Sequence, residues 1–295
     1  MRDAVASTGL RLKELDEDDA LNLGCLSALQ RLALAGRLSR REILCRAAAC
    51  VGNLEKLQAL REDGWLWDDG TCTDAAMGGH LEVLQWARAN GCLWNSNTCA
   101  NAAKGGHLEM LQWARANGCP WDEDTCWWAA GEGQLEILKW LHENDFSWDE
   151  EETCSSAALG GHLEVLQWLY ANGCPWNEDT CSGAALGGHL EVLQWLRANG
   201  CPWDKQTCQY AARGHLEMLQ WARANECPWN WETCSWAACG GHFEVLQWAR
   251  ANGCPWNEWT CSGAAEGGHR VYAYAARQRH FELVSWAKAN GAPEA

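Results

Sequence analysis

The sequence predicts an all-α fold: a helical repeat solenoid of about nine helix pairs after an N-terminal cap, with little or no β-structure. Two observations lead to this prediction. A tryptophan closes each repeat and returns in steps of 26 to 28 residues, at Trp67, Trp94, Trp121, Trp148, Trp176, Trp203, Trp229 and Trp256. Each period contains two short stretches with helical apolar spacing, and none alternates apolar and polar residues long enough for a strand. Because such a short helix pair cannot bury its own apolar face, the repeats have to stack.

The first helix of a repeat is clearest between Asn177 and Gly188. Asn177 can cap it, because a side-chain oxygen accepts the unpaired backbone N–H groups of a first turn. Glu178 follows where the helix dipole favours negative charge. The pair Gly187-Gly188 ends the helix, because glycine readily takes the left-handed conformation of a helix C-terminus. Equivalent caps are expected at Asp122, Asp204, Asn230 and Asn257.

The second helix begins near His189 and carries one broad apolar face. That face consists of Leu190, Val192, Leu193, Trp195 and Leu196. Asn199 and Gly200 stop the helix, and Pro202 forbids its continuation. We therefore predict that Trp195 is a core residue, whereas Glu191 on the opposite side contributes little to stability.

The motif Thr-Cys-x-x-Ala-Ala-x-x-Gly-His-Leu-Glu-Val-Leu-Gln-Trp-x-x-x-x-Gly recurs in register and resembles the ankyrin repeat, with its Thr-Pro-Leu-His-x-Ala-Ala-x-x-Gly-His-Leu-Glu-Val-Val pattern. The resemblance covers roughly residues 44–292. It is closer still to the short, tryptophan-rich ankyrin-like arrays of protists and large DNA viruses. These repeats have 27 residues against about 33 in ankyrins. The missing residues come mainly from the connection that carries a β-hairpin finger in ankyrins.

The repeat register divides the chain into four segments. Residues 1–16 are predicted to be a disordered tail, 17–42 a degenerate N-terminal capping repeat, 43–259 the tandem repeats, and 260–295 an irregular C-terminal capping repeat. The last segment starts the motif at Ala264 and restarts it 11 residues later at Ala275, which indicates an insertion. Atypical terminal repeats are expected, because they shield the ends of a stack.

The charge balance excludes some partners. The formal net charge is −16, from 39 acidic and 23 basic residues, and no basic cluster exists. A phosphate backbone would be repelled, so nucleic-acid binding is not expected, whereas a basic protein partner would be attracted. No segment approaches the length of a membrane span, and residues 1–17 lack the apolar core of a secretory signal. We expect a monomer in the reducing cytoplasm.

Eighteen cysteines raise the question of metal or disulfide sites. Most occupy two slots of the repeat, one in the first helix and one in the Gly-Cys-Pro turn. The spacing of Cys92, Cys99 and His107 would suit zinc. However, the turn slot also accepts Trp65 and Phe146, so it favours apolar volume over a thiolate. Structural thiols are the preferred interpretation, with zinc and disulfides as alternatives; no catalytic residue and no cofactor is expected.

The repeating histidines follow glycine at a helix start, and we interpret them as hydrogen-bonding ties between adjacent loops. No Ser/His/Asp set, carboxylate dyad or phosphate-binding loop stands out, so the protein is not expected to be an enzyme. Sixteen of the 22 tryptophans fill two repeating slots and are predicted to be core.

Comparison of the repeats locates a candidate partner-binding surface. The repeats differ most at the two residues after the helix cysteine and at the residue after Ala-Ala. By resemblance to ankyrins, these positions belong to the helix that lines the concave surface where a protein partner lies. Aromatic residues and arginine dominate interface hot spots. The predicted contact residues are Trp127, Trp128, Gln209, Tyr210, Arg213, Trp231, Trp236 and Trp259.

Several alternatives stay open at this point. Drift after duplication, or the filling of gaps between repeats, would also explain the additional indoles. Within binding functions, the alternative is the substrate-receptor subunit of a ubiquitin ligase, although the separate box motif of such arrays is absent here. From another class, a metal- or redox-responsive cysteine array is possible. The leading hypothesis is a non-enzymatic protein-interaction scaffold.

Overall fold

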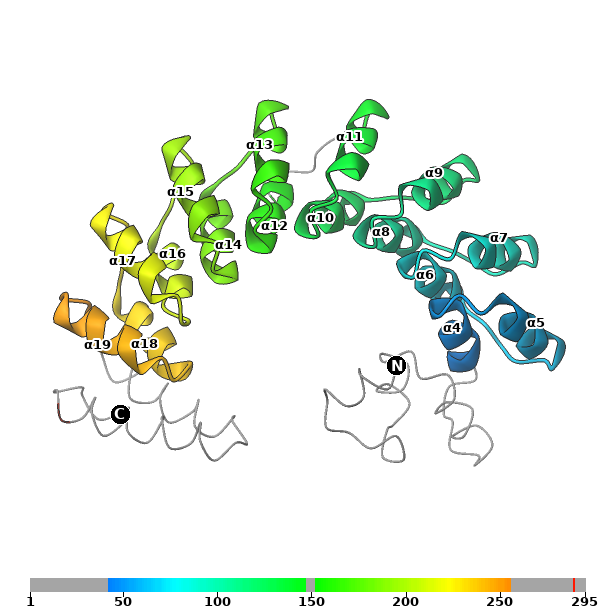
Figure 1. Cartoon of the computed structure of the whole chain (residues 1–295), viewed down its shortest axis with the longest axis horizontal. Coiled ribbons are helices and arrows are strands. Elements are labelled where there is room, and N and C mark those ends of the chain that lie inside the picture. The colour runs from blue at the N-terminus through cyan, green and yellow to red at the C-terminus, as the bar shows by residue number, and fades with distance from the viewer. Residues whose placement is uncertain (1–41, 147–151, 256–288, 290–295) are drawn as a thin grey trace. The chain divides into compact units, whose positions relative to one another are not determined.

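The computed structural model describes residues 42–146, 152–255 and Ala289. These residues contain sixteen helices and no strand (Figure 1). The predicted tail at 1–16 lies outside the described residues, as do the capping repeats at 17–42 and 260–295 apart from Glu42 and Ala289. The all-α prediction is confirmed for the part of the chain that the structure describes.

The helices fall into two compact units, divided after Ser147. The first unit contains α4 (Ile43–Cys50), α5 (Leu54–Glu62), α6 (Asp69–Met77), α7 (Leu81–Ala89), α8 (Ser96–Lys104), α9 (Leu108–Ala116), α10 (Glu123–Gly131) and α11 (Leu135–Glu143). The second contains α12 (Glu152–Gly160), α13 (Leu163–Ala171), α14 (Glu178–Gly187), α15 (Leu190–Ala198), α16 (Lys205–Ala211), α17 (Leu216–Ala224), α18 (Trp231–Cys239) and α19 (Phe243–Ala251). Even-numbered helices are helix A of a repeat and odd-numbered ones helix B.

Helix A is the stacking element in both units. In the first unit α4 packs on α6, α6 on α8 and α8 on α10, and in the second α12 packs on α14, α14 on α16 and α16 on α18. Each helix A also packs on helix B of its own repeat. Figure 1 shows that, within each unit, the row of A helices lies inside the row of B helices. The predicted stack of helix pairs is therefore confirmed within each unit.

Helix A begins and ends largely as the residues predict. Asn177 Oδ1 accepts from Asp179 N at 2.9 Å, and the corresponding atom of Asp204 accepts from Gln206 N at 2.8 Å. Asn230 caps α18 in the same way. Asp122 makes no side-chain cap hydrogen bond, contrary to expectation, and Asn257 lies outside the described residues. Gly188 follows α14 at a φ of 79°, in the left-handed conformation that favours glycine.

Small side chains let neighbouring A helices approach closely. Cys181 and the alanine pair Ala184–Ala185 are fully buried in α14, and the same slots are buried in the other described repeats. On helix B, Val192, Leu193 and Leu196 complete the core. Hydrophobic burial, the main stabilising contribution to folding, is thus concentrated between successive A helices and between A and B.

The repeating tryptophans are half-buried, so the prediction that they are enclosed in the core is wrong for the described repeats. Trp203 packs edge-to-face on Trp221 of the next repeat, with ring centroids 5.9 Å apart. The guanidinium of Arg197 covers the Trp203 ring at 4.2 Å and also donates to the carbonyl of Cys201. An indole is too large for the space between these short helices, so it is covered by an arginine and a neighbouring indole instead.

The histidines that follow Gly-Gly connect successive repeats. The Nε2 atom of His107 lies 3.2 Å from the carbonyl oxygen of Met77, in the preceding repeat. His80 contacts the carbonyl of Cys50 at 3.1 Å, and His189 contacts that of Leu159 at 3.1 Å. The interpretation of these histidines as ties between loops is confirmed.

Candidate functional site

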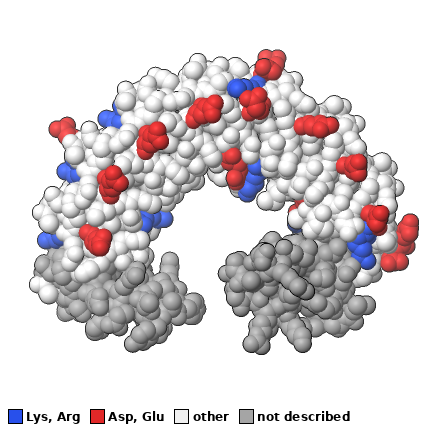
Figure 2. All heavy atoms as spheres, in the orientation of Figure 1, with Lys and Arg blue, Asp and Glu red and all other residues white. Residues whose placement is uncertain are grey.

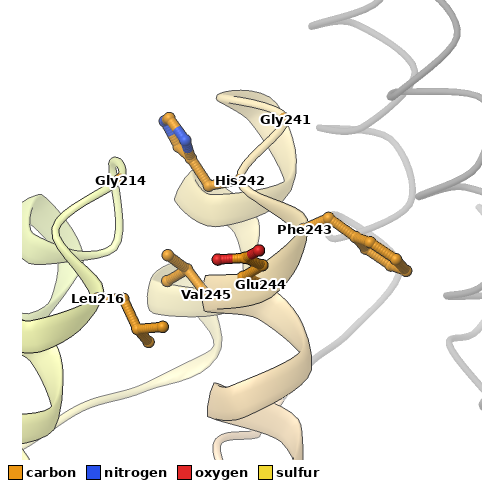
Figure 3. Close-up of a pocket in the computed structure, with 7 residues that line it drawn as sticks. All are labelled: Gly214, Leu216, Gly241, His242, Phe243, Glu244 and Val245. Carbon is orange, nitrogen blue, oxygen red and sulfur yellow. The ribbon is translucent and has the colours of Figure 1, made fainter.

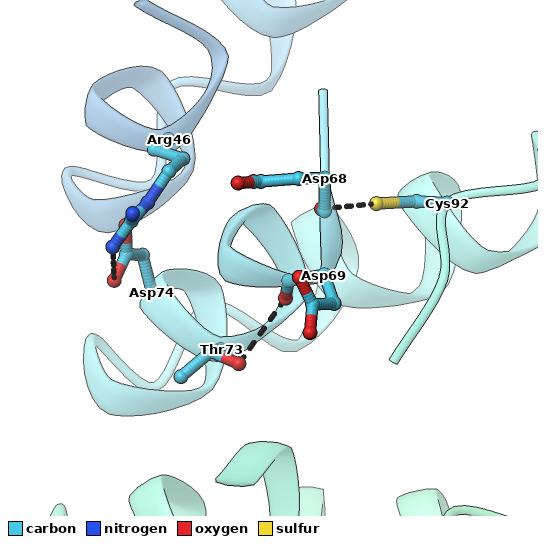
Figure 4. Close-up of polar contacts among 6 residues, drawn as sticks. All are labelled: Arg46, Asp68, Asp69, Thr73, Asp74 and Cys92. Atoms are coloured by element: carbon cyan, nitrogen blue, oxygen red, sulfur yellow. Dashed lines mark hydrogen bonds and ion pairs between the residues drawn. The ribbon is translucent and has the colours of Figure 1, made fainter. Parts of the chain in front are cut away.

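The positions at which the repeats differ meet each other across the helix-A stack. We call the two residues after the helix-A cysteine the first and second variable positions, and the residue after Ala-Ala the third. Arg46, at the first position of α4, pairs with Asp74, at the second position of α6 (Figure 4). Arg46 Nε lies 2.8 Å from Asp74 Oδ2. The second position therefore faces the preceding helix A.

In the first unit this arrangement places a lysine against an indole. Lys104, at the third position of α8, holds its Nζ 3.5 Å from the ring centroid of Trp128, at the second position of α10. Trp127 lies beside Trp128, with centroids 4.6 Å apart and ring planes at 86°. Both indoles are half-buried. We call Lys104, Trp127 and Trp128 the lysine cluster.

In the second unit an arginine occupies the same position as Lys104. Arg213, at the third variable position of its repeat and in the turn after α16, lies 4.0 Å above the ring of Trp236, at the second position of α18. The same guanidinium lies 5.2 Å from the ring of Tyr210. Trp236 is 38% exposed, more than any other described tryptophan. We call Tyr210, Arg213 and Trp236 the arginine cluster.

The two cations of these clusters have no acidic partner among the described residues. The Nε atom of Arg213 is buried and has no hydrogen-bond partner. Lys104 contacts the Trp128 ring and forms no ion pair with a described carboxylate. In contrast, Arg46 at the start of the stack is neutralised by Asp74. An aromatic face leaves the N–H edges of a guanidinium available for a planar anionic group.

Gln209 is buried and hydrogen-bonds to α18 and its N-cap residue. It is only 6% exposed, and its Nε2 donates to Glu232 Oε2 at 2.6 Å and to Asn230 Oδ1 at 3.2 Å. Asn230 Nδ2 also donates to Glu232 at 2.9 Å. Gln209 lies on α16 and Arg213 in the turn that follows it, whereas Glu232 and Trp236 lie four residues apart on one side of α18. The two contacts therefore join the same two neighbouring repeats.

One further predicted contact residue, Trp231, is described by the structure. Trp231 is the half-buried first residue of α18, and five residues of helix place it about 140° around the axis from Trp236. Trp259 lies outside the described residues. The geometry therefore brings together Trp127 with Trp128 in one unit, and Tyr210, Arg213 and Trp236 in the other.

Two leucines extend the apolar character of the second unit's helix-A face. Leu159 and Leu186, at the third positions of α12 and α14, are 38% and 37% exposed. The two helices approach closely at Gly183, where an added Cβ would lie 2.7 Å from the Ser155 carbonyl oxygen. Sequence reasoning identified these positions as variable but omitted both leucines from the contact residues. An exposed leucine at a third position was the signal that would have found them.

Acidic side chains are spread over both units, as Figure 2 shows. A regular part of this charge is one exposed glutamate in the first turn of every described helix B. These are Glu55, Glu82, Glu109, Glu136, Glu164, Glu191, Glu217 and Glu244. None of them belongs to the lysine or arginine cluster, so the local charge of the clusters is opposite to the net charge.

Two cavities are formed by helix B residues and the adjoining loops. One of about 500 Å³ is lined by Gly214, Leu216, Gly241, His242, Phe243, Glu244 and Val245 (Figure 3). Its two ionisable residues, His242 and Glu244, project from the start of α19. Another of about 500 Å³ is lined by Gln58, Arg61, Glu62, Trp67, Trp86 and Asn90. Neither includes a residue predicted from the sequence to contact a partner.

The zinc alternative gains no geometric support in the part of the chain that the structure describes. There, no three His, Cys, Asp or Glu side chains gather closely enough to hold a metal ion. Cys99 hydrogen-bonds to Cys119, and His107 contacts the Met77 carbonyl. Among the described helices, none is long and apolar enough to cross a membrane.

Comparison with known proteins gives a match to a family model and similarity to solved structures. A family model for ankyrin repeats (many copies) matches residues 126–170. No curated protein matches the chain. Among solved structures, the crystal structure of the human ASB11 ankyrin repeat domain aligns with a TM-score of 0.44 and 18% sequence identity, over 54% of this chain and 84% of that chain.

Proposed function

We propose that this chain is an ankyrin-repeat protein that acts as a non-enzymatic scaffold and holds a protein partner on its helix-A face. Ankyrin repeats generally mediate protein–protein interaction. The observation that supports the proposed face is the pairing of Arg213 with the exposed indole of Trp236. Tryptophan, tyrosine and arginine are the residue types in which binding energy concentrates at interfaces.

The chemistry of the clusters favours an acidic side chain on the contacting segment of the partner. Arg213 and Lys104 each present a cation on an aromatic face without an ion pair to a described carboxylate. A partner carboxylate would receive a charge-assisted hydrogen bond from either cation. The net charge of −16 favours a partner that is basic elsewhere, because long-range attraction acts on the whole molecule.

The partner's apolar contacts would lie along the second unit's exposed leucines. Like Trp236, Leu159 and Leu186 each have more than a third of their surface exposed. Burying them would add hydrophobic stabilisation of roughly 25 cal/mol per Å² of apolar surface removed from water. We propose that the scaffold acts as a monomer in the cytoplasm, where the thiols of the described cysteines would stay reduced.

Affinity capture from the source cell tests this proposal. The full chain is compared with Trp236→Ala and Trp128→Ala, and with Gln194→Ala as a control at an exposed position of α15. We expect both tryptophan variants to lose at least tenfold in captured partner, with melting temperatures close to that of the parent chain. The Gln194 variant should capture normally.

Two outcomes would contradict the proposal. Equal capture by all three variants would place the partner elsewhere on the molecule. Large losses of melting temperature in both tryptophan variants would show that the two indoles are part of the core, as the gap-filling alternative holds. Far-UV circular dichroism of each variant separates loss of fold from loss of binding.

A further inference from the structure

The two cysteine slots of a repeat meet in the structure. In six described repeats, the helix-A cysteine lies against the cysteine that follows helix B of the same repeat. The sulfur atoms of Cys154 and Cys174 are 3.3 Å apart. The pairs are Cys72–Cys92, Cys99–Cys119, Cys154–Cys174, Cys181–Cys201, Cys208–Cys227 and Cys234–Cys254. All of these thiols are 4% exposed or less.

The loop cysteine of each pair is fixed on more than one side. Cys92 Sγ hydrogen-bonds to the carbonyl oxygen of Asp68, the N-cap residue of α6, at 3.1 Å (Figure 4). The guanidinium of Arg88 donates to the carbonyl of Cys92 itself. The equivalent sulfur–carbonyl contact of Cys201 with Asn177 measures 3.3 Å. These contacts hold the loop sulfur against the first turn of helix A.

In four of these pairs, those of Cys92, Cys119, Cys174 and Cys254, the pKa values of the two thiols are shifted in opposite directions. The hydrogen bond from Cys72 lowers the pKa of Cys92, whereas the same hydrogen bond, together with burial, raises the pKa of Cys72. The pKa values of Cys119 and Cys254 are lowered by the corresponding hydrogen bonds. The loop sulfur is therefore the one that becomes a thiolate more readily, and thiolates are the nucleophiles in cysteine oxidation.

We propose that each of these pairs is a site of reversible oxidation to a disulfide within one repeat, with hydrogen peroxide as the oxidant. The loop thiolate attacks one peroxide oxygen, the O–O bond breaks, and a sulfenic acid and water form once a proton is taken up. The helix-A sulfur then attacks the sulfenic sulfur, which forms the S–S bond and releases a second water. Two thiols and one peroxide thus give one disulfide and two waters.

The geometry suits this reaction because the resolving thiol is already in contact. The Cys154 and Cys174 sulfurs at 3.3 Å need to approach by roughly 1.3 Å to reach the disulfide length of about 2.0 Å. Burial requires a repeat to open locally before peroxide enters, and stacked repeats open in such local steps. The bond would tie the first turn of helix A to the loop after helix B. Closing that loop removes entropy from the unfolded chain and so stabilises the repeat.

The sequence supplies a matched control in the first described repeat. Cys45 occupies the helix-A slot, but the loop slot of that repeat holds Trp65. Burial raises the pKa of Cys45 to about 11, so this thiol is also slow to react by itself. Peroxide should therefore leave Cys45 reduced while the six pairs are linked. Restoring a thiol with Trp65→Cys should create a seventh link.

The experiment is peptide mapping of the full chain under non-reducing conditions. Reduced protein is treated with hydrogen peroxide, free thiols are alkylated, and disulfide-linked peptides are quantified by mass spectrometry. We expect the six within-repeat links to exceed any other link at least tenfold, with Cys45 alkylated. The melting temperature should rise on oxidation and return after reduction with a dithiol. Cys92→Ser should lose only the link to Cys72.

The proposal would be overturned by links between repeats or between chains. It would also be overturned if peroxide left every thiol of the folded chain free for alkylation. The control is the urea-unfolded chain, which must consume peroxide under the same conditions. The wild-type map and the Cys92→Ser map decide the question even if Trp65→Cys fails to fold.

Discussion

The contact between Gly161 and His189 offers a quantitative test of how successive repeats are joined. Gly161 has a φ of 78°, and a Cβ added there would lie 2.4 Å from His189 Nδ1. The left-handed conformation costs an L-residue roughly 1–2 kcal/mol. The clash would also turn the imidazole away from the Leu159 carbonyl, which it now contacts at 3.1 Å, and a lost hydrogen bond costs about 1 kcal/mol. Gly161→Ala should therefore lower the free energy of unfolding of the protein by roughly 2–3 kcal/mol.

Gly173 provides the matched control, because its φ is 80° and nothing lies within 4 Å of an added Cβ. Gly173→Ala should lower the free energy of unfolding only by the cost of the left-handed backbone conformation, roughly 1–2 kcal/mol. His189→Ala should lower the free energy of unfolding by about 1 kcal/mol. The double variant Gly161→Ala/His189→Ala should lower it no more than Gly161→Ala alone, since each single substitution removes the same hydrogen bond. Urea unfolding followed by far-UV circular dichroism measures all four. Equal losses for Gly161→Ala and Gly173→Ala, or full additivity in the double variant, would refute the reasoning.

Other predictions concern helix B. Trp195→Ala should lower the free energy of unfolding by roughly 2–3 kcal/mol, less than the roughly 3–5 kcal/mol expected for an enclosed indole. The reason is that Trp195 is half-buried and packs edge-to-face on Trp176. A loss above that range in urea unfolding would show an enclosed ring. Glu191→Ala, at an exposed position, should change stability by less than about 0.5 kcal/mol in the same assay. Arg197→Ala should cost roughly 1–2 kcal/mol, because it uncovers Trp203 and frees a loop carbonyl; an unchanged urea midpoint would mean that the stacking is not stabilising.

The repeat itself could be predicted in detail from the sequence, because its signals are local. Asn177 as a cap and Gly188 as a stop depend on a few neighbouring residues, and both are observed. The histidine ties were also predictable, since a residue repeated at one loop position has the same neighbour in every repeat. The segments 1–16, 17–42 and 260–295 remain predictions.

Contacts between repeats were harder to predict, because they depend on the offset of one helix A against the next. The repeat pattern showed that Arg213 and Trp236 occupy variable positions, but not that the third position of one helix meets the second of the next. Gln209 occupies a variable position of the same repeat as Arg213, yet its amide turns to Glu232 and becomes buried. The cysteine pairs were missed for a similar reason: Cys72 and Cys92 were considered as separate slots although the fold brings them together.

The central claim is that the helix-A face, through the arginine cluster, binds the partner. The most direct test is the dissociation constant of the captured partner for Arg213→Glu, compared with Lys205→Glu. The two variants change the net charge equally, but Lys205 is an exposed residue at the start of α16, whereas Arg213 follows the end of that helix. If the cluster receives a carboxylate, Arg213→Glu should weaken binding at least tenfold and Lys205→Glu by less than about threefold, since exposed charges beyond contact are screened by salt. Equal effects of the two variants, or unchanged affinity in Arg213→Glu, would contradict the claim.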